Sequence, residues 1–112
     1  MINRSEVLRR VGQDQQILLG VIEDFLLFYP DMIANLRSAM EAGAGDRIVR
    51  AAHILKSAAA AVGAHELREL ARHLEESGRN GDLLSAPEVS QRIYEEVALV
   101  DAELRRWQDE LP

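Results

Sequence analysis

The chain of 112 residues has the length of one compact domain, residues 1–112, rather than two. Apolar types make up 47% of it, aromatic types only 4%, and cysteine is absent, so we expect an aliphatic core without disulfides, thiolate nucleophiles or cysteine-bearing zinc sites. Thirteen basic against 19 acidic residues give a formal net charge of −6, which argues against nucleic acid and an anionic membrane surface as partners.

The first predicted elements are a short helix and a long one. Residues 1–11 carry a short apolar pattern, closed by Gly12, and lack the continuous apolar stretch of a signal peptide. Asp14 is expected to cap a long helix in which apolar residues recur every three or four positions. No apolar run approaches the roughly 20 residues that span a bilayer. We therefore expect a soluble protein of the cytoplasm.

The long helix contains a proline. Pro30 lies inside the apolar pattern, and we expect a break or kink near Tyr29 because the ring removes a backbone donor and crowds the preceding turn. The pattern resumes after Pro30 and ends at Gly43 and Gly45. Asp46 is then expected to cap the next helix.

Two shorter helices follow in the middle of the chain. The first is expected to run to about Val62 and to stop at Gly63. The second covers residues 65–77, where leucine and alanine recur at helical spacing, and is expected to end at Gly78.

The last predicted helix begins after Ser85, its expected N-cap, with Pro87 in the first turn, where proline is tolerated. Its apolar residues continue at helical spacing as far as Trp107. No segment shows strand-type alternation between turn signals. Short connections between long amphipathic helices favour antiparallel neighbours. We therefore predict an all-α fold, an antiparallel up-and-down four-helix bundle with one or two extra short N-terminal helices.

The most informative side chain is His53, in the helix that follows Asp46. At about 100° per residue, one stripe of this helix collects the apolar side chains of its core face, Ile48, Ala52, Leu55, Ala59 and Val62. His53 points about 140° away from that stripe and therefore faces outward. Its neighbours on this face are Val49, Arg50, Lys56, Ser57 and Ala60, most of which have short side chains. A second globular surface could therefore come close to the imidazole.

Lys56 distinguishes His53 from an ordinary surface histidine. It is the only lysine in the chain, and it lies three positions after His53 on the same helix face. A flexible ammonium beside an imidazole suits a phosphoryl group carried on that imidazole.

One spaced pattern runs through His53 into the following helix. It is Ala52-His53-x-Leu55-Lys56-x-Ala58-x-x-x-x-Gly63-Ala64, followed by Leu67, Leu70-Ala71 and Leu74-Glu75. Glycine-bearing turns stand before and after it, Ala42-Gly43-x-Gly45-Asp46 and Gly78-Arg79-x-Gly81-Asp82. The pattern and its turns resemble the histidine phosphotransfer (HPt) family of two-component phosphorelays, over nearly the whole chain.

The resemblance implies that His53 is the phosphorylated residue and that Lys56 steadies the phosphoryl group. The imidazole would accept the group from an aspartyl phosphate on a response-regulator receiver domain and pass it reversibly to another receiver aspartate. Sensor or hybrid histidine kinases are the other implied partners. Mg²⁺ would come with the receiver, and no permanently bound cofactor is expected. We expect a monomer, because a histidine that must admit a receiver argues against an oligomer that buries this face.

The surroundings of His53 suggest a docking face and an orienting residue. The receiver would dock on Val49, Arg50, Ser57, Ala60 and Ala64. Ser57 stands where the family usually has glycine, which puts closeness of approach or choice of partner in question. Glu75 stands where the family often has an amide or carboxylate that accepts a hydrogen bond from the inner nitrogen of the histidine, leaving the outer nitrogen as nucleophile. The other interpretation of Glu75 is a solvated charge.

The other two histidines have simpler explanations. His65 stands at a helix start, where a capping or exposed role is expected. His73 has Glu69 four residues before it and Glu76 three residues after it. Di-iron bundles instead use Glu-x-x-His paired with carboxylates on other helices, so no metal site is predicted.

Two functions remain to be separated. The chain has no Gly-x-x-x-x-Gly-Lys-Ser/Thr phosphate loop and no Gly-x-Gly-x-x-Gly motif, so we predict a phosphoryl carrier without its own ATP-binding kinase site. The alternative is a degenerate helical adaptor that binds signalling partners without phosphoryl transfer, with Ser57 as a sign of drift. Retention of His53 and Lys56 counts against the adaptor.

Overall fold

The computed structural model describes residues 1–112 and is all-helical, as predicted. Its five helices are α1 (Arg4–Arg10), α2 (Gln15–Ala42), α3 (Gly45–Ala61), α4 (His65–Arg79) and α5 (Ala86–Glu110). It contains no strand, and its one isolated bridge pairs Ile2 with Ala64. None of the helices combines the length and the apolar character that a membrane-spanning segment requires.

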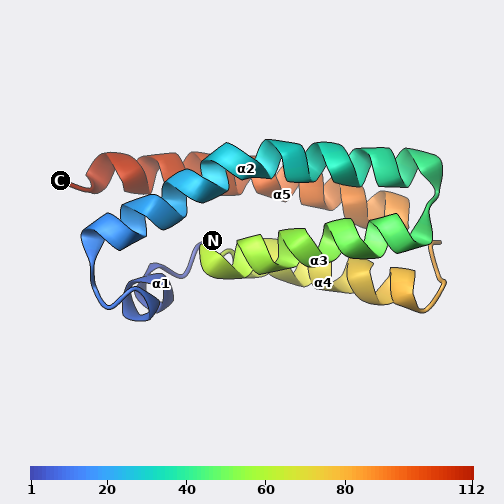
Figure 1. Ribbon diagram of the computed structural model, residues 1–112, viewed down its shortest axis with the longest axis horizontal. Helices are drawn as coiled ribbons and strands as arrows, with labels where there is room; N and C mark the ends of the chain where they lie inside the picture. Colours follow the sequence, from blue (N-terminus) through green and yellow to red (C-terminus); the bar gives the residue numbers. More distant parts are fainter.

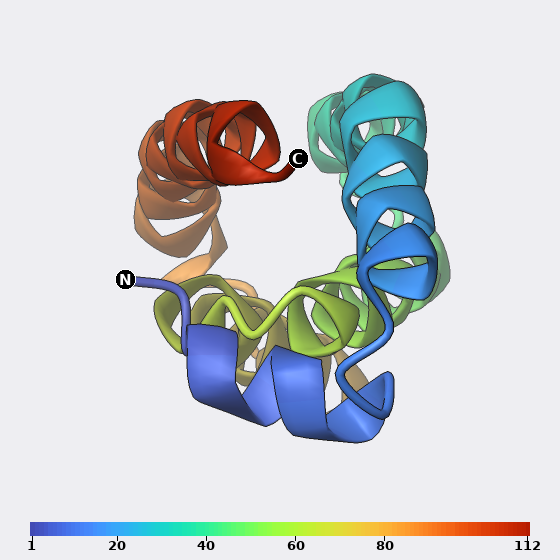
Figure 2. The same ribbon diagram turned by 90° about the vertical axis from the view of Figure 1, so that its left-hand side faces the viewer.

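The four long helices lie side by side, and each runs opposite to the one before it (Figure 1). In order, α2 packs on α3, α3 on α4, α4 on α5, and α5 returns to contact α2. Seen from one end, they surround a common interior, and α1 crosses the ends of α3 and α4 (Figure 2). A cluster of 26 buried apolar residues fills that interior, with leucine, isoleucine, valine and alanine predominating.

The helix ends show which capping predictions hold. Asp14 caps α2 by accepting from the backbone N–H groups of Gln16 and Ile17, at 2.9 and 3.1 Å, as predicted. Gly43 ends α2 in the left-handed conformation, with φ of 59°. Ser85 stands at the N-cap of α5 but makes no side-chain capping bond.

The predicted capping role of Asp46 is wrong. Helix α3 begins two residues earlier than the sequence suggested, so Ala44 is the N-cap and Asp46 lies in the first turn. The backbone of Ala44 is extended, and it makes no side-chain capping bond. A carboxylate in the first turn still interacts favourably with the positive end of the helix dipole.

Of the break or kink expected near Tyr29, the break does not occur, because α2 continues through Pro30 as one helix. Figure 1 shows the ribbon of α2 changing direction along its length, as a helix that contains proline does. Pro30 is exposed, so water can satisfy the carbonyl that the proline leaves without a donor. Tyr29 is anchored on both sides: its ring stacks on Phe25, and its hydroxyl bonds the carboxylate of Asp101 on α5.

Helix α4 runs through Gly78 rather than ending there. A Cβ at Gly78 would come within 2.7 Å of Cγ2 of Val49, so the glycine allows α3 and α4 to approach closely. This close approach matters because α3 carries His53 and α4 carries Glu75, whose side chains meet across it.

Candidate functional site

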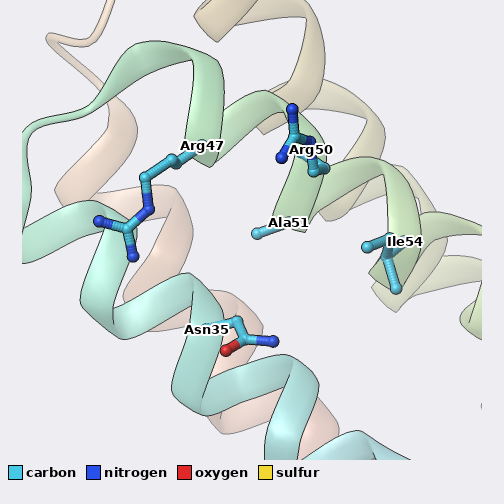
Figure 3. A pocket seen from close by; sticks show the side chains of 5 residues that line it. All are labelled: Asn35, Arg47, Arg50, Ala51 and Ile54. Carbon is cyan, nitrogen blue, oxygen red and sulfur yellow. The ribbon is translucent and has the colours of Figure 1, made fainter.

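His53 lies on the outer face of α3, as its helical position predicted. The five residues of the predicted core stripe are each at most 1% exposed, whereas the His53 side chain is 54% exposed. Arg50, one turn earlier, lies on the α3 rim of a cleft whose other wall is Asn35 of α2 (Figure 3). The imidazole therefore has two flanks at the surface. The flank toward α2 carries arginines, and the flank toward α4 carries Glu75.

Glu75 on α4 lies under the imidazole and is only 2% exposed. Its Oε2 is 2.8 Å from Nδ1 of His53. Of the two interpretations of Glu75, the solvated charge is therefore wrong, and the carboxylate contacts the inner nitrogen of the ring. An ionised carboxylate only accepts hydrogen bonds, so Nδ1 carries the proton, and Nε2 of the neutral ring keeps a free lone pair.

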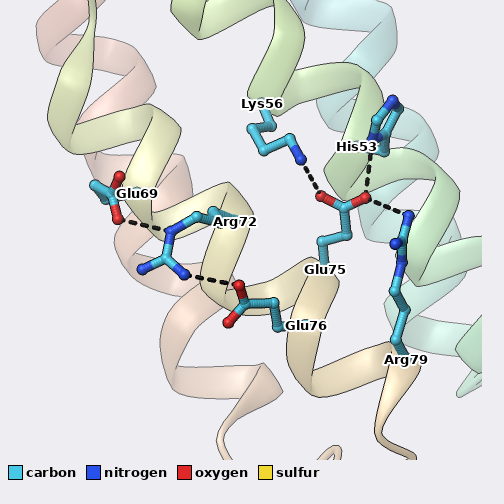
Figure 4. A network of polar contacts seen from close by, with 7 residues as sticks. All are labelled: His53, Lys56, Glu69, Arg72, Glu75, Glu76 and Arg79. Carbon is cyan, nitrogen blue, oxygen red and sulfur yellow. Dashed lines mark hydrogen bonds and ion pairs between the residues drawn. The ribbon is translucent and has the colours of Figure 1, made fainter.

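Three cationic or proton-donating side chains converge on Glu75 (Figure 4). Lys56 places its Nζ 2.6 Å from Oε1, while Arg79 places Nη2 2.7 Å from Oε2, the oxygen that also meets His53. The hydrogen bond from Lys56 is the main cause that holds the pKa of Glu75 below its ordinary value, and the bond from His53 acts in the same direction against the opposing effect of burial. Glu75 is therefore held as an anion.

Arg79 is the member of this group that the sequence analysis missed. It follows Glu75 by four residues on the same helix, a spacing at which opposite charges meet. That spacing was visible in the sequence, but the significance of Arg79 depends on the burial of Glu75, which no local pattern reveals.

Lys56 lies one turn after His53 on the same face, and its side chain is 28% exposed. Its ammonium carries three donors and bonds one oxygen of Glu75. The lysine ammonium therefore stands one helical turn from His53, held by the same carboxylate that contacts the ring.

The predicted docking face holds only in part. Arg50 and Ser57 are exposed, and Val49 and Ala60 are half-buried. Ala60 already uses its carbonyl, which accepts from Nη1 of Arg10 at 2.7 Å, so α1 lies at this end of the face.

Ala64 is not part of any docking surface, and its assignment there was wrong. It is 2% exposed, because the N-terminal segment passes over it and pairs Ile2 with it. The backbone N–H of Asn3 also donates to the carbonyl of Gly63 at 2.9 Å. These contacts join residues 60 or more positions apart, which explains why helical periodicity did not predict them.

The other two histidines lie in different surroundings. Nε2 of His65 is 2.6 Å from Oε2 of Glu6, so this residue ties the start of α4 to α1. His73 is exposed on α4, and the two carboxylates nearest to it in sequence, Glu69 and Glu76, both bond Arg72 at 2.8 Å. No group of three or more acidic or histidine side chains is arranged to hold a metal ion.

The site is an exposed imidazole rather than a pocket. None of the five surface cavities includes His53 among its lining residues. A reacting group is therefore best presented by a second macromolecule. A neutral imidazole over a buried anion, with a lysine ammonium one turn away, suits attack on a group that brings negative charge of its own.

Two of three comparisons match this chain to known proteins. The sequence model of the Hpt domain matches residues 20–110. The crystal structure of histidine-containing phosphotransfer protein B (HptB) from Pseudomonas aeruginosa PAO1 superimposes with a TM-score of 0.91 at 22% sequence identity, covering 99% of this chain and 96% of that one. A search of curated proteins gave no significant match.

Proposed function

This chain belongs to the Hpt domain family, whose members carry phosphoryl groups on histidine in phosphorelays, and we propose that His53 is the residue that carries the phosphoryl group here. The observation that supports this assignment is the contact between Nδ1 of His53 and buried Glu75 at 2.8 Å. His53 is the histidine that combines an exposed ring with a buried carboxylate and a lysine one turn away.

The proposed reaction is an in-line displacement. Nε2 of His53 attacks the phosphorus of an aspartyl phosphate on a receiver domain; the N–P bond forms, the O–P bond breaks, and the aspartate leaves as a carboxylate. Because Nδ1 keeps its proton, the phosphorylated ring carries positive charge, which the Glu75 carboxylate stabilises at 2.8 Å. The reverse reaction, toward a second receiver aspartate, releases the neutral ring.

Lys56 supplies mobile positive charge in this proposal. Its ammonium can leave Oε1 of Glu75 for the phosphoryl oxygens, since Arg79 and His53 still bond the other carboxylate oxygen. The incoming negative charge is thereby offset at the moment that the group arrives.

The remaining components of the reaction come from the partners. Hpt domains are phosphoryl carriers rather than kinases, and they act between kinase and receiver domains of two-component systems. We propose that Mg²⁺ and its acidic pocket belong to the receiver, that this chain acts as a monomer, and that the exchange takes place in the cytoplasm, where ATP-dependent kinases begin the relay.

We also propose to describe the scaffold as an antiparallel up-and-down four-helix bundle with one short N-terminal helix. Successive long helices run in opposite directions, and α1 crosses one end of the group. Such a scaffold suits a positioned nucleophile, because His53 and Glu75 come from two neighbouring helices that packing holds rigidly.

The test is phosphotransfer from a phosphorylated receiver in the presence of Mg²⁺. We expect an acid-labile, base-stable phosphoprotein from the wild-type chain and none from His53→Gln, with the helical circular dichroism and Tm nearly unchanged because the side chain is exposed. His73→Gln, on the exposed face of α4, serves as the matched control and should label normally. Labelling of His53→Gln would refute the assignment, and a wild-type chain that binds receivers but never labels would be the adaptor.

A further inference from the structure

A basic cleft opens between α2 and α3, next to the exposed face of His53. It has a volume of about 180 Å³ and is lined by Asn35, Arg47, Arg50, Ala51 and Ile54. Figure 3 shows Arg47 extending from α3 toward α2, with Asn35 on the opposite wall and Arg50 on the α3 rim. We call these five residues the basic cleft.

The positive charge of the basic cleft is not balanced by any carboxylate of the chain. Arg47 donates from Nη2 to the hydroxyl of Ser38 at 2.9 Å and forms no ion pair. Arg50 forms neither a side-chain hydrogen bond nor an ion pair. On α4, by contrast, Arg72 and Arg79 each bond carboxylates. Two unpaired guanidinium groups in one cleft of a chain with a net charge of −6 form a local field that attracts anions.

The position of the basic cleft relates it to the proposed reaction. Arg50 precedes His53 by one helical turn, so a surface that covers the imidazole also reaches the cleft rim. The α4 side of His53 is occupied by the contacts of Lys56 and Arg79 with Glu75. On the α2 side, Ile54 is 46% exposed and offers an apolar contact beside the two arginines.

We infer that the basic cleft binds an acidic side chain of the receiver domain that docks over His53, and thereby contributes to the choice among receivers. This inference rests on the proposed function. A guanidinium fork matches a carboxylate in geometry, and the amide of Asn35 offers a further donor from the opposite wall. The cleft acts on docking, because its arginines contact neither Glu75 nor the imidazole.

The experiment uses the receiver that phosphorylates the wild-type protein fastest. The double variant Arg47→Gln/Arg50→Gln is compared with Arg92→Gln/Arg106→Gln, which removes the same charge from exposed positions on α5. We expect the KM for the receiver to rise about three- to tenfold in the cleft variant and to change little in the control, with the maximal transfer rate unchanged in both. The difference should shrink as salt is raised.

Phosphoramidate, a small chemical donor of phosphoryl groups to histidine, separates docking from chemistry. It needs no docking surface, so the cleft variant should label with it at the wild-type rate. An increase in KM no larger than that of the α5 control, or slower labelling by phosphoramidate, would overturn the role of the cleft in docking. Failure of the wild-type chain to label at His53 with either donor would instead remove the proposed function, so the two failures are distinguishable.

Discussion

Two neighbouring glutamates on α4 carry the same charge and have opposite surroundings. Glu75 is 2% exposed and contacts His53, Lys56 and Arg79, whereas the side chain of Glu76 is 60% exposed and bonds Arg72 alone (Figure 4). Both glutamates have an arginine four residues away on their own helix. The difference is made by α3, which supplies the lysine and the histidine on one side of α4 only.

The comparison shows why burial changes the significance of an ion pair. Solvent and salt screen the exposed contacts of Arg72, which resemble ordinary helix-surface pairs. A buried carboxylate loses its hydration and must be satisfied by protein donors, and three side chains do so for Glu75. Glu75 thereby orients the imidazole of His53 and keeps the ammonium of Lys56 beside it.

The largest expected effect comes from removing each carboxylate in turn. Glu75→Ala leaves Nδ1 of His53 without its acceptor, so the ring loses both its orientation and the anion that stabilises its phosphorylated form. We expect the receiver-to-histidine transfer rate to fall about ten- to hundredfold, the range known for carboxylates that orient histidine ligands of metals. The free energy of unfolding should fall by about 1–3 kcal/mol, because Lys56 also loses its partner.

Glu76→Ala is the matched control, since it changes the next residue on the same helix. We expect transfer within about twofold of wild type and little change in stability, as for most exposed positions. Equal losses in the two variants, measured by rapid-quench transfer and urea unfolding, would show that burial of Glu75 has no bearing on phosphotransfer.

A smaller effect on the transfer rate is expected from replacing Arg79, with Arg72 as its control. Arg79→Gln removes one of the two groups that bond Oε2 of Glu75, so Lys56 becomes harder to release from Oε1 toward a phosphoryl group. We expect transfer to slow about two- to fivefold, the size of a single solvent-exposed charge contact. Arg72→Gln, which breaks the contacts with Glu69 and Glu76, should leave the rate unchanged.

Arg79→Lys sharpens the comparison of Arg79 with Arg72, because it keeps the positive charge but loses the guanidinium fork. It should recover part of the lost rate if Arg79 acts by positioning charge on Glu75. An Arg72→Gln variant as slow as Arg79→Gln would contradict the distinction between the two arginines.

The smallest expected effect is on the pH dependence of stability. The pKa of Glu75 is lowered in the folded protein, chiefly by the hydrogen bond from Lys56, so the unfolded chain binds the proton more readily. The stabilisation is therefore complete above the ordinary value of 4.5 and is lost as the pH falls through the lowered pKa. Urea unfolding should show a higher free energy of unfolding for wild type than for Glu75→Gln at pH 7. This difference should narrow as the pH falls below 4.5. A difference in the free energy of unfolding that widens in acid would contradict the lowered pKa of Glu75.

The local sequence predicted much of the fold and the outward direction of His53. These features depend on residues that are close together in the chain. They include the spacing of apolar residues in each helix, the Asp14 cap and the left-handed Gly43. The outward direction of His53 also follows from one helix alone, since residues on a helix repeat every 3.6 positions and its core stripe is apolar. Arg79 lay within reach of the same reasoning, through its spacing from Glu75.

Other features were decided by contacts between distant segments. Ala64 is buried because the N-terminal segment covers it, and Pro30 is accommodated in α2 because it faces solvent there. Glu75 was ambiguous in the sequence, since a carboxylate at a helix position can face water or a neighbouring helix. Periodicity along the chain was enough to predict an all-helical fold with an outward histidine and a lysine beside it. Only the packing of α4 against α3 decided that a buried carboxylate joins them, because burial depends on which helices meet and local periodicity describes one helix at a time.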